Sequence, residues 1–133
     1  MNIFSQFHST QHDNELSQQL VVRNMKNSDN KSDVHYLLKN IELDINNKDV
    51  EIFVLQEERK KHILGVGCVL FKLTNKHRIG VIGEIYNIHT HKSVNIEDRN
   101  KFIEEIANFA IDSGCYACTL KNSYLDCIRC KTN

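Results

Sequence analysis

Two pairs of cysteines near the C-terminus have a spacing that suits metal binding. Cys115 and Cys118 form one Cys-x-x-Cys pair, and Cys127 and Cys130 form another. Four thiolates can hold zinc in a tetrahedral site. Only eight residues separate these pairs, however, fewer than the roughly 15–20 of a zinc ribbon. Residues three apart on a strand also face opposite sides of a sheet. We therefore expect structural cysteines and no bound zinc, with a small zinc-binding interaction domain as the alternative.

His89 and His91 are a second candidate site, because side chains two residues apart on a strand share a face. Such a pair can bind a metal or act as a general base near neutral pH. The alternative, which we favour, is a pair of solvated residues at a strand end. No spacing in the chain matches the local signature of a Ser/His/Asp or Cys/His catalytic site. Cys68 lies within an apolar run that is typical of a core.

The pattern of apolar residues predicts the strands and helices that position these side chains. Apolar residues at helical spacing predict a helix from Ser32 to Leu43 and a longer one from about Ile96 to Ser113, which Gly114 ends. Residues 123–130 are expected to begin a short helix. Runs rich in β-branched and aromatic residues predict strands over 20–23, 50–55, 63–73, 78–88 and 115–120.

This order of elements, β-α-β-β-β-α-β-α, predicts a single α/β domain. The central strands are expected to pair as antiparallel hairpins, and the last strand to follow a helical crossover. Gly80 and Gly83 are expected to mark a β-bulge or a place where another group approaches the backbone. We place the domain at residues 18–133, after a flexible N-terminal segment at 1–17 that carries few apolar side chains.

Composition and charge argue against several classes of protein. The chain has 133 residues, with 17 Lys and Arg against 17 Asp and Glu. A net charge of zero is unlike that of a general nucleic-acid or membrane-surface binder, although it leaves room for local patches. We interpret Lys60, Lys61 and His62 as a solvated hairpin turn. The longest apolar run, Ile63–Phe71, is too short to span a bilayer. Because the N-terminus lacks the pattern of a secretory signal, we expect a cytoplasmic protein with reduced cysteines.

Three stretches of the chain carry a resemblance to a known family. They are Leu20–Asp29 with the apolar residues that follow it, Gly83–Ile88, and Phe102–Ala110 with the run Gly-Cys-Tyr-x-x-Thr-Leu at 114–120. Together they resemble the opening strand and helix, the fourth strand, and the long helix with the fifth strand of the GNAT superfamily of acetyl-CoA-dependent N-acetyltransferases. The last run is similar to that of glucosamine-6-phosphate N-acetyltransferases. The resemblance covers Leu20–Asn122.

The resemblance implies a mixed, mostly antiparallel sheet flanked by helices, and transfer of acetyl from acetyl-CoA to a primary amine such as an amino-sugar phosphate. It also implies that main-chain groups at the end of the fourth strand orient pantetheine and polarise the carbonyl. The matching positions are Ile88, His89 and Thr90. Tyr124 takes the place of the general acid for the leaving thiolate, and Glu84 is the catalytic candidate that orients the amine or its water. Further cofactor-binding positions are Asn95, Arg99 and Asn122.

The chain departs from the family in the loop that should bind pyrophosphate. The family motif, R/Q-x-x-G-x-G/A, exposes main-chain N–H groups at the start of the long helix. Here the matching region, Lys92–Asn100, has no glycine. Glu97 and Asp98 in the first turn stabilise the helix and repel phosphate, for which Lys92 and Arg99 compensate only in part. The sequence therefore predicts a well-capped helix start in place of an anion site.

The C-terminal end is a second departure, because only thirteen residues follow Leu120. The last strand of the family is expected to be missing. The edge of the fifth strand is then unpaired unless a second copy, another protein or a loop covers it. Both departures favour an alternative to the active enzyme, a catalytically inactive GNAT-fold domain that acts as a binding or assembly module. For the enzyme we expect acetyl-CoA and a small amine as partners, and neither nucleic acid nor membrane.

Overall fold

The computed structural model describes residues 19–29, 46–75, 79–121 and 129–130, the last two by their backbone alone. The segment 1–17, the predicted helix at Ser32–Leu43, and the residues Asn122, Tyr124 and Cys127 lie outside this part of the chain. The described elements, in chain order, are β1 (Leu20–Asn24), β2 (Val50–Glu57), β3 (Ile63–Thr74), β4 (Gly80–Thr90), α3 (Ile96–Asp112), β5 (Ala117–Leu120) and β6 (Arg129–Cys130).

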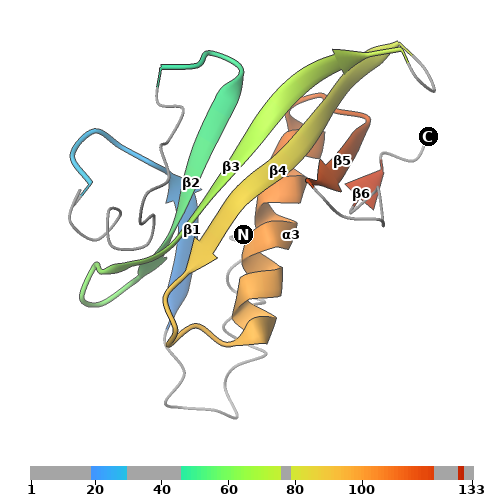
Figure 1. Cartoon of the computed structure of the whole chain (residues 1–133). Coiled ribbons are helices and arrows are strands. Elements are labelled where there is room, and N and C mark those ends of the chain that lie inside the picture. The colour runs from blue at the N-terminus through green and yellow to red at the C-terminus, as the bar shows by residue number, and fades with distance from the viewer. Residues whose placement is uncertain (1–18, 30–45, 76–78, 122–128, 131–133) are drawn as a thin grey trace.

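The strands form a single sheet in the order β1-β2-β3-β4-β5-β6 (Figure 1). Neighbouring strands are antiparallel except β4 and β5, which run parallel because α3 connects them as a crossover. The predicted mixed, mostly antiparallel sheet is therefore confirmed. Its strands follow the predicted runs closely, since runs of β-branched and aromatic residues favour a pleated, half-buried surface.

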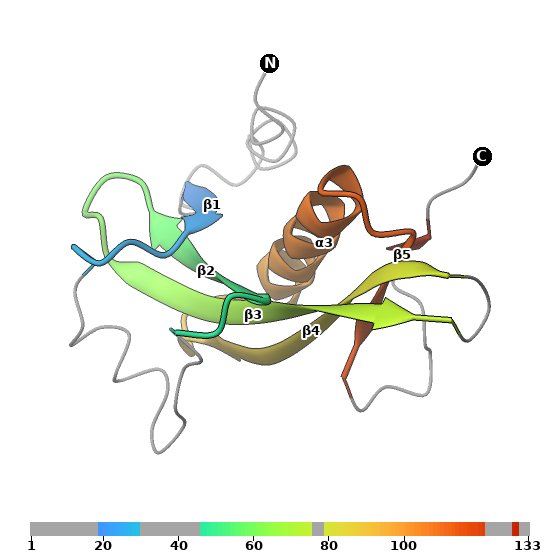
Figure 2. The ribbon, with the colours of Figure 1, turned by 90° about the horizontal axis from the view of Figure 1, so that it is seen from above.

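The long helix α3 covers one face of the sheet (Figure 2). Its apolar stripe, which includes Phe102, Ile106 and Ala110, is buried against the strands. Phe53 of β2 meets Phe109 of α3 edge to face, with ring centroids 4.8 Å apart. The main core therefore lies between α3 and the sheet.

Within the described residues, no helix is both long and apolar enough to cross a membrane.

The end of α3 confirms the predicted role of Gly114. This glycine has a φ of 112°, a conformation that L side chains rarely adopt. The N–H of Cys115 donates to the carbonyl of Ala110, and the N–H of Gly114 donates to that of Ile111. These two bonds form a Schellman motif, which satisfies carbonyls at the helix end. Through this turn the chain passes from the end of α3 into β5.

Gly80 and Gly83 mark close approaches to the backbone, and no bulge occurs at either position. A Cβ atom at Gly83 would lie 3.0 Å from the Cβ of Ala110 on α3, and one at Gly80 would lie 2.9 Å from the ring of Tyr116. Both glycines sit within the regular β3–β4 pairing. The expectation of a bulge here was therefore wrong, whereas the alternative of close packing is confirmed.

The free edge predicted for the fifth strand is partly covered. Arg129 and Cys130 form the short strand β6, which pairs antiparallel with Cys118 and Ala117. The expectation of a short helix reaching Cys130 is wrong at these two residues. A strand of this length has no apolar pattern of its own, so the sequence could not reveal it. In β5 only Ala117 and Cys118 take part in this pairing.

Candidate functional site

The candidate site lies where β4 and β5 part. β5 pairs with β4 from Ala117 to Leu120, and the last bond between them runs from the N–H of Lys121 to the carbonyl of Ile85, at 2.9 Å. β4 then continues through Tyr86 to Thr90, and no described strand pairs with this part of it on the β5 side. A strand paired on one side turns every second N–H and C=O to the open side. Among the described residues, Asn87–Thr90 therefore forms a main-chain edge without a strand partner on the β5 side (Figure 1).

A β-bulge begins this edge of β4. His89 pairs with Val66 and Tyr86 pairs with Cys68, so Asn87 and Ile88 together oppose the single residue Gly67. Asn87 has a φ of 52°, in the left-handed region that asparagine tolerates better than most residues. Bulges bend a strand and re-aim its side chains, and they are over-represented beside active sites.

The bulge decides which side chains of β4 face α3. A Cβ atom at Gly67 would lie 2.5 Å from Cδ1 of Ile88 and 2.8 Å from Cδ1 of Ile106, which places Ile88 on the α3 face. Thr90 lies on the same face, because a Cβ at Gly65 would approach its methyl group. Glu84, Tyr86 and His89 then face the opposite side, as their pairing with β3 shows.

Glu84 and Tyr86 lie at the point of parting, on the face away from α3. The side chain of Glu84 is 24% exposed, and one of its carboxylate oxygens lies 3.9 Å from Nζ of Lys72. The ammonium of Lys121 stands over the ring of Tyr86, 5.7 Å from its centroid. The sequence analysis singled out Glu84 but missed Tyr86, Lys72 and Lys121. For Tyr86 a signal was present, because residues i and i+2 of a strand share a face.

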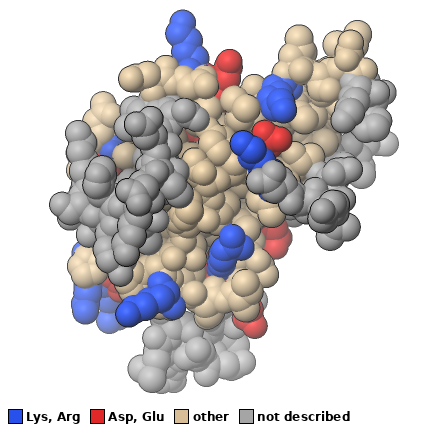
Figure 3. All heavy atoms as spheres, viewed as in Figure 1, with Lys and Arg blue, Asp and Glu red and all other residues tan. Residues whose placement is uncertain are grey.

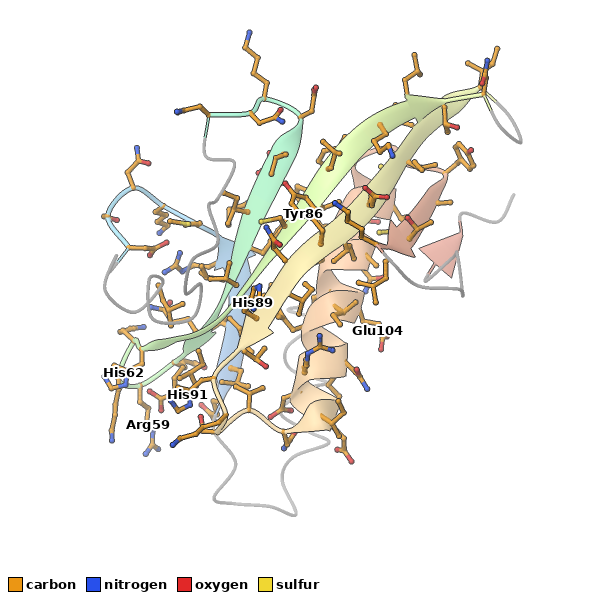
Figure 4. The ribbon with its side chains drawn as sticks, in the orientation of Figure 1. Arg59, His62, Tyr86, His89, His91 and Glu104 are labelled. Carbon is orange, nitrogen blue, oxygen red and sulfur yellow. The ribbon has the colours of Figure 1, made fainter. Side chains whose placement is uncertain are left out.

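His89 faces the same side as Tyr86 and is half-buried (Figure 4). Burial lowers the pKa of its imidazole, and the positive charge of Arg99 lowers it further. The side chain is therefore neutral at pH 7. Arg99 lies in the first turns of α3. The sequence analysis assigned both residues to cofactor binding, and that assignment stays a prediction.

The start of α3 is capped by its own side chains. Oδ1 of Asn95 accepts the N–H of Asp98 at 2.8 Å, and the carbonyl of Asn95 accepts the N–H of Arg99 at 3.0 Å. Asn95 is thus the N-cap of the helix. In the first turn of α3, at most the N–H groups of Ile96 and Glu97 then remain available to donate a hydrogen bond to a ligand. The predicted capped start is confirmed, and the side-chain oxygen of Asn95 is engaged in it.

Asp98 differs from its sequence interpretation, which treated it as a carboxylate facing incoming phosphate. The residue is only 7% exposed and lies on the buried stripe of α3. Its Oδ1 atom has no hydrogen-bond partner among the described residues. Burial raises the pKa of this carboxyl group. An ionised Asp98 therefore weakens the domain at neutral pH, because burial penalises its charge.

The cysteines of the structure belong to the core. Cys115 precedes β5, and both Cys115 and Cys118 pack in the main core cluster. The expectation that they face opposite sides was therefore wrong, because only Cys118 lies on the strand. Burial raises the pKa of the Cys118 thiol to about 12. Among the described residues, no three His, Cys, Asp or Glu side chains are gathered around a possible metal. Cys127 and the side chain of Cys130 lie outside that set.

His91 is held in the loop after β4. Its N–H donates to the carbonyl of Leu64 at 2.7 Å, and its Nδ1 accepts the N–H of Ser93 at 3.0 Å. These two hydrogen bonds hold His91 in position at the end of β4. Tyr124 and Asn122 lie outside the described residues, so their predicted roles stay predictions.

No protein-family model matches the chain, and no curated protein matches it in sequence. Solved structures do match it in fold. Glucosamine-6-phosphate N-acetyltransferase from Arabidopsis thaliana matches with a TM-score of 0.63 at 19% identity, over 80% of this chain and 84% of that chain. A GNAT family acetyltransferase from Staphylococcus aureus matches with a TM-score of 0.61 at 16% identity, over 86% of this chain and 94% of that one.

A third match was solved with acetyl-CoA. This predicted acetyltransferase from Clostridium acetobutylicum has a TM-score of 0.52 at 16% identity, over 80% of this chain and 83% of that chain. At such identities the likeness concerns the fold and leaves the reaction open. The chain therefore has the fold of the GNAT acetyltransferases.

Proposed function

We propose that this chain transfers an acetyl group from a pantetheine thioester to a primary amine. One observation carries the proposal, the main-chain edge of β4 from Asn87 to Thr90, which no described strand pairs with on the β5 side. A pantetheine arm contains two amide groups, and an exposed strand edge binds extended amides as it would bind a further strand. The shared fold with an acetyltransferase solved with acetyl-CoA supports this use of the edge.

The two halves of acetyl-CoA fit the described residues differently. The pantetheine half suits the edge of β4 from Asn87 to Thr90, because no described strand pairs with it on the β5 side. The diphosphate half does not suit the start of α3, where Asn95 already accepts the N–H of Asp98 and the exposed carboxylate of Glu97 occupies the first turn. We therefore propose a pantetheine thioester as the donor and assign no step to the diphosphate.

The proposed reaction uses Glu84 and the main-chain edge. Attack by the amine nitrogen on the thioester carbonyl forms the C–N bond, and the C–S bond then breaks. Glu84 takes the proton that the amine loses, and main-chain N–H groups of β4 between Asn87 and Thr90 polarise the carbonyl. The departing thiolate takes up a proton from a general acid, for which Tyr124 remains the candidate.

The acceptor is proposed to be an amine that also carries a negative charge, such as an amino-sugar phosphate. Two cations, Lys72 and Lys121, lie beside Glu84 and Tyr86 on the face away from α3. The carboxylate of Glu84 balances one of these two positive charges, so the three side chains together keep a net positive charge. That charge favours an anionic acceptor over a neutral one.

Release of free thiol tests the proposal. Acetylpantetheine is the donor, and glucosamine 6-phosphate and glucosamine are the acceptors. We expect thiol release that depends on the amine and is faster with the phosphorylated sugar. Glu84→Gln should lower kcat by about 100-fold, the lower limit for loss of a general base. Glu104→Gln is the matched control, because Glu104 is an exposed residue of α3 outside the edge of β4 from Asn87 to Thr90 (Figure 4). Full activity of Glu84→Gln would contradict the role given to that carboxylate.

The capped start of α3 favours a second candidate, a GNAT-fold domain without catalysis that serves as a binding or assembly module. The proposed partner, a second copy or another protein, would extend the sheet beyond β5, where the described part of β6 pairs only with Ala117 and Cys118. Folded protein that releases no thiol from acetylpantetheine or acetyl-CoA with any amine would support this candidate. Localisation in the cytoplasm remains a prediction.

A further inference from the structure

Two lysines flank Glu84 and Tyr86 on the face of the sheet away from α3. Nζ of Lys72, on β3, lies 3.9 Å from a carboxylate oxygen of Glu84. Nζ of Lys121, the residue after β5, lies 5.7 Å from the centroid of the Tyr86 ring. Figure 3 views this face and shows Lys and Arg side chains beside Asp and Glu side chains on it. The two strands that neighbour β4 therefore each bring a positive charge to this part of it.

The pairing of β5 with β4 fixes the place of Lys121. Thr119 pairs with Glu84, and the N–H of Lys121 donates to the carbonyl of Ile85 at 2.9 Å. Because residues two apart on a strand share a face, the side chain of Lys121 leaves the backbone on the same side as that of Glu84. Its ammonium then stands over the ring of Tyr86, two residues after Glu84 on β4. The backbone therefore directs Lys121 toward this site.

The two lysines differ in what balances their charge. The carboxylate of Glu84 faces Lys72, whereas Tyr86 offers Lys121 only the face of a ring, which carries no net charge. Among the residues that the structure describes, no carboxylate forms an ion pair with Lys121. Lys121 is exposed, and an ammonium group has three N–H donors. Lys121 can therefore bind an anion from solution without giving up an existing ion pair.

The ring of Tyr86 limits where this ammonium can lie. A lysine has a flexible four-carbon stem, so it loses conformational entropy when it binds a ligand. Tyr86 is half-buried and lies on β4 itself, which makes its ring a fixed support for the cation (Figure 4). Holding the ammonium in place beforehand lowers the entropy cost of binding. Tyr86 is therefore a positioning residue in this arrangement, and Lys121 is the residue that contacts the ligand.

From these observations we infer that Lys121 is the specificity-determining residue of the acceptor site, where it binds the anionic group of the acceptor. The inference rests on the proposed function and assigns its charge selectivity to one residue. The amine of the acceptor lies at Glu84, and its phosphate lies at Lys121. Lys72 holds the carboxylate of Glu84 and takes no part in this selectivity. A phosphate suits the site, because lysine binds phosphate as a point charge and needs no paired geometry.

Calorimetric binding of four sugars, in the absence of any donor, tests the inference. Glucosamine 6-phosphate, glucosamine, glucose 6-phosphate and glucose differ from one another only at the amine and phosphate positions. We expect glucosamine 6-phosphate to bind about ten-fold more tightly than glucosamine, with a difference that shrinks as salt is added. Glucose 6-phosphate should keep this advantage over glucose, because Lys121 does not contact the amine. Equal affinities with and without the phosphate would overturn the inference.

Removal of one positive charge assigns the effect to Lys121. Lys121→Gln should weaken the binding of glucosamine 6-phosphate by about ten-fold and affect glucosamine much less. Lys60→Gln is the matched control, because Lys60 is an exposed lysine in the turn between β2 and β3 and forms no ion pair with a described residue. Circular dichroism confirms that each variant is folded. Equal weakening by both variants, or by neither, would overturn the assignment to Lys121.

A double-mutant cycle tests the positioning role of Tyr86. Tyr86→Leu should weaken the binding of glucosamine 6-phosphate, but it should have little effect in a chain that already carries Lys121→Gln. Tyr86→Phe keeps the ring and should keep the preference for the phosphorylated sugar. Weakening by Tyr86→Leu that persists in the Lys121→Gln chain would overturn this role, because the ring would then act through the fold and not through Lys121.

Turnover separates failure of the inference from failure of the proposed function. With acetylpantetheine as donor, Lys121→Gln should raise KM for glucosamine 6-phosphate about ten-fold and should change kcat much less than Glu84→Gln does. Thiol release with a phosphate preference that survives Lys121→Gln overturns the inference and keeps the proposed function. Binding of glucosamine 6-phosphate that depends on Lys121, without turnover of any thioester, keeps the anion site and overturns the enzyme.

Discussion

Tyr86 and His89 are three residues apart on β4, yet their side chains face the same side of the sheet. Regular alternation would instead group Tyr86 with Ile88 and Thr90. The extra residue at Asn87 reverses that order, so Ile88 packs over Gly67 beneath α3 while His89 joins Glu84 and Tyr86. The bulge therefore both separates the two faces of the site and begins the edge of β4 that no described strand pairs with on the β5 side.

The backbone at Asn87 provides the first prediction. Its φ of 52° is unfavourable for a residue with a Cβ atom and no local polar group. Asn87→Ala should lower the free energy of unfolding in urea by about 1 kcal/mol. Asn87→Gly is the control and should lie closer to the wild type, because glycine adopts this conformation freely. Equal stabilities for the two variants would mean that the bulge does not depend on this conformation.

Gly67 and Ile88 provide a second prediction, because the bulge places one directly over the other. Gly67→Ala should lower the free energy of unfolding by about 1–3 kcal/mol, since the new methyl group would overlap the buried side chains of Ile88 and Ile106. Adding Ile88→Ala removes one of these contacts. The double variant should therefore lose less stability than the sum of the two single changes. Strict additivity would contradict the packing described for the bulge.

The buried carboxyl group of Asp98 gives the domain a particular pH dependence. Because its pKa is raised in the folded state, the folded protein holds the proton more tightly than the unfolded chain does. Stability from this group is present at low pH and is lost as pH rises from about 4 through the raised pKa. Asp98→Asn should therefore unfold at a higher urea concentration than the wild type at pH 7, and the two should converge toward pH 4. Glu104→Gln, at an exposed position in the middle of α3, should show no such trend.

Much of the fold could be predicted from the sequence because its long elements have strong patterns. The apolar run of β3 and the helical stripe of α3 are each long enough for periodicity to show, and Gly114 has the conformation of a helix end. The position of the bulge could not be predicted from the sequence, because glycine was taken as its marker and the glycines concerned were Gly80 and Gly83. Those glycines serve close packing, whereas the bulge uses a left-handed asparagine.

The candidate site was predictable only in part, for a related reason. Glu84, His89 and Arg99 were identified from the family resemblance; Glu84 and His89 lie on β4, Arg99 lies in the first turns of α3, and their roles stay predictions. The side of the sheet that each one faces depends on the bulge, which shifts alternation by one residue. Asp98 is buried because of the way α3 packs on the sheet. The sequence could not indicate this, because an acidic residue in the first turn of a helix is expected whether or not it is buried.

The most direct test of the central claim follows the backbone amide signals of the protein by NMR during titration with acetylpantetheine. The account predicts that the largest shifts occur between Asn87 and Thr90, where no described strand pairs with β4 on the β5 side. Signals of Ile96–Asp98 at the capped start of α3 should move little. Shifts concentrated at the start of α3, or absent along β4, would contradict the account.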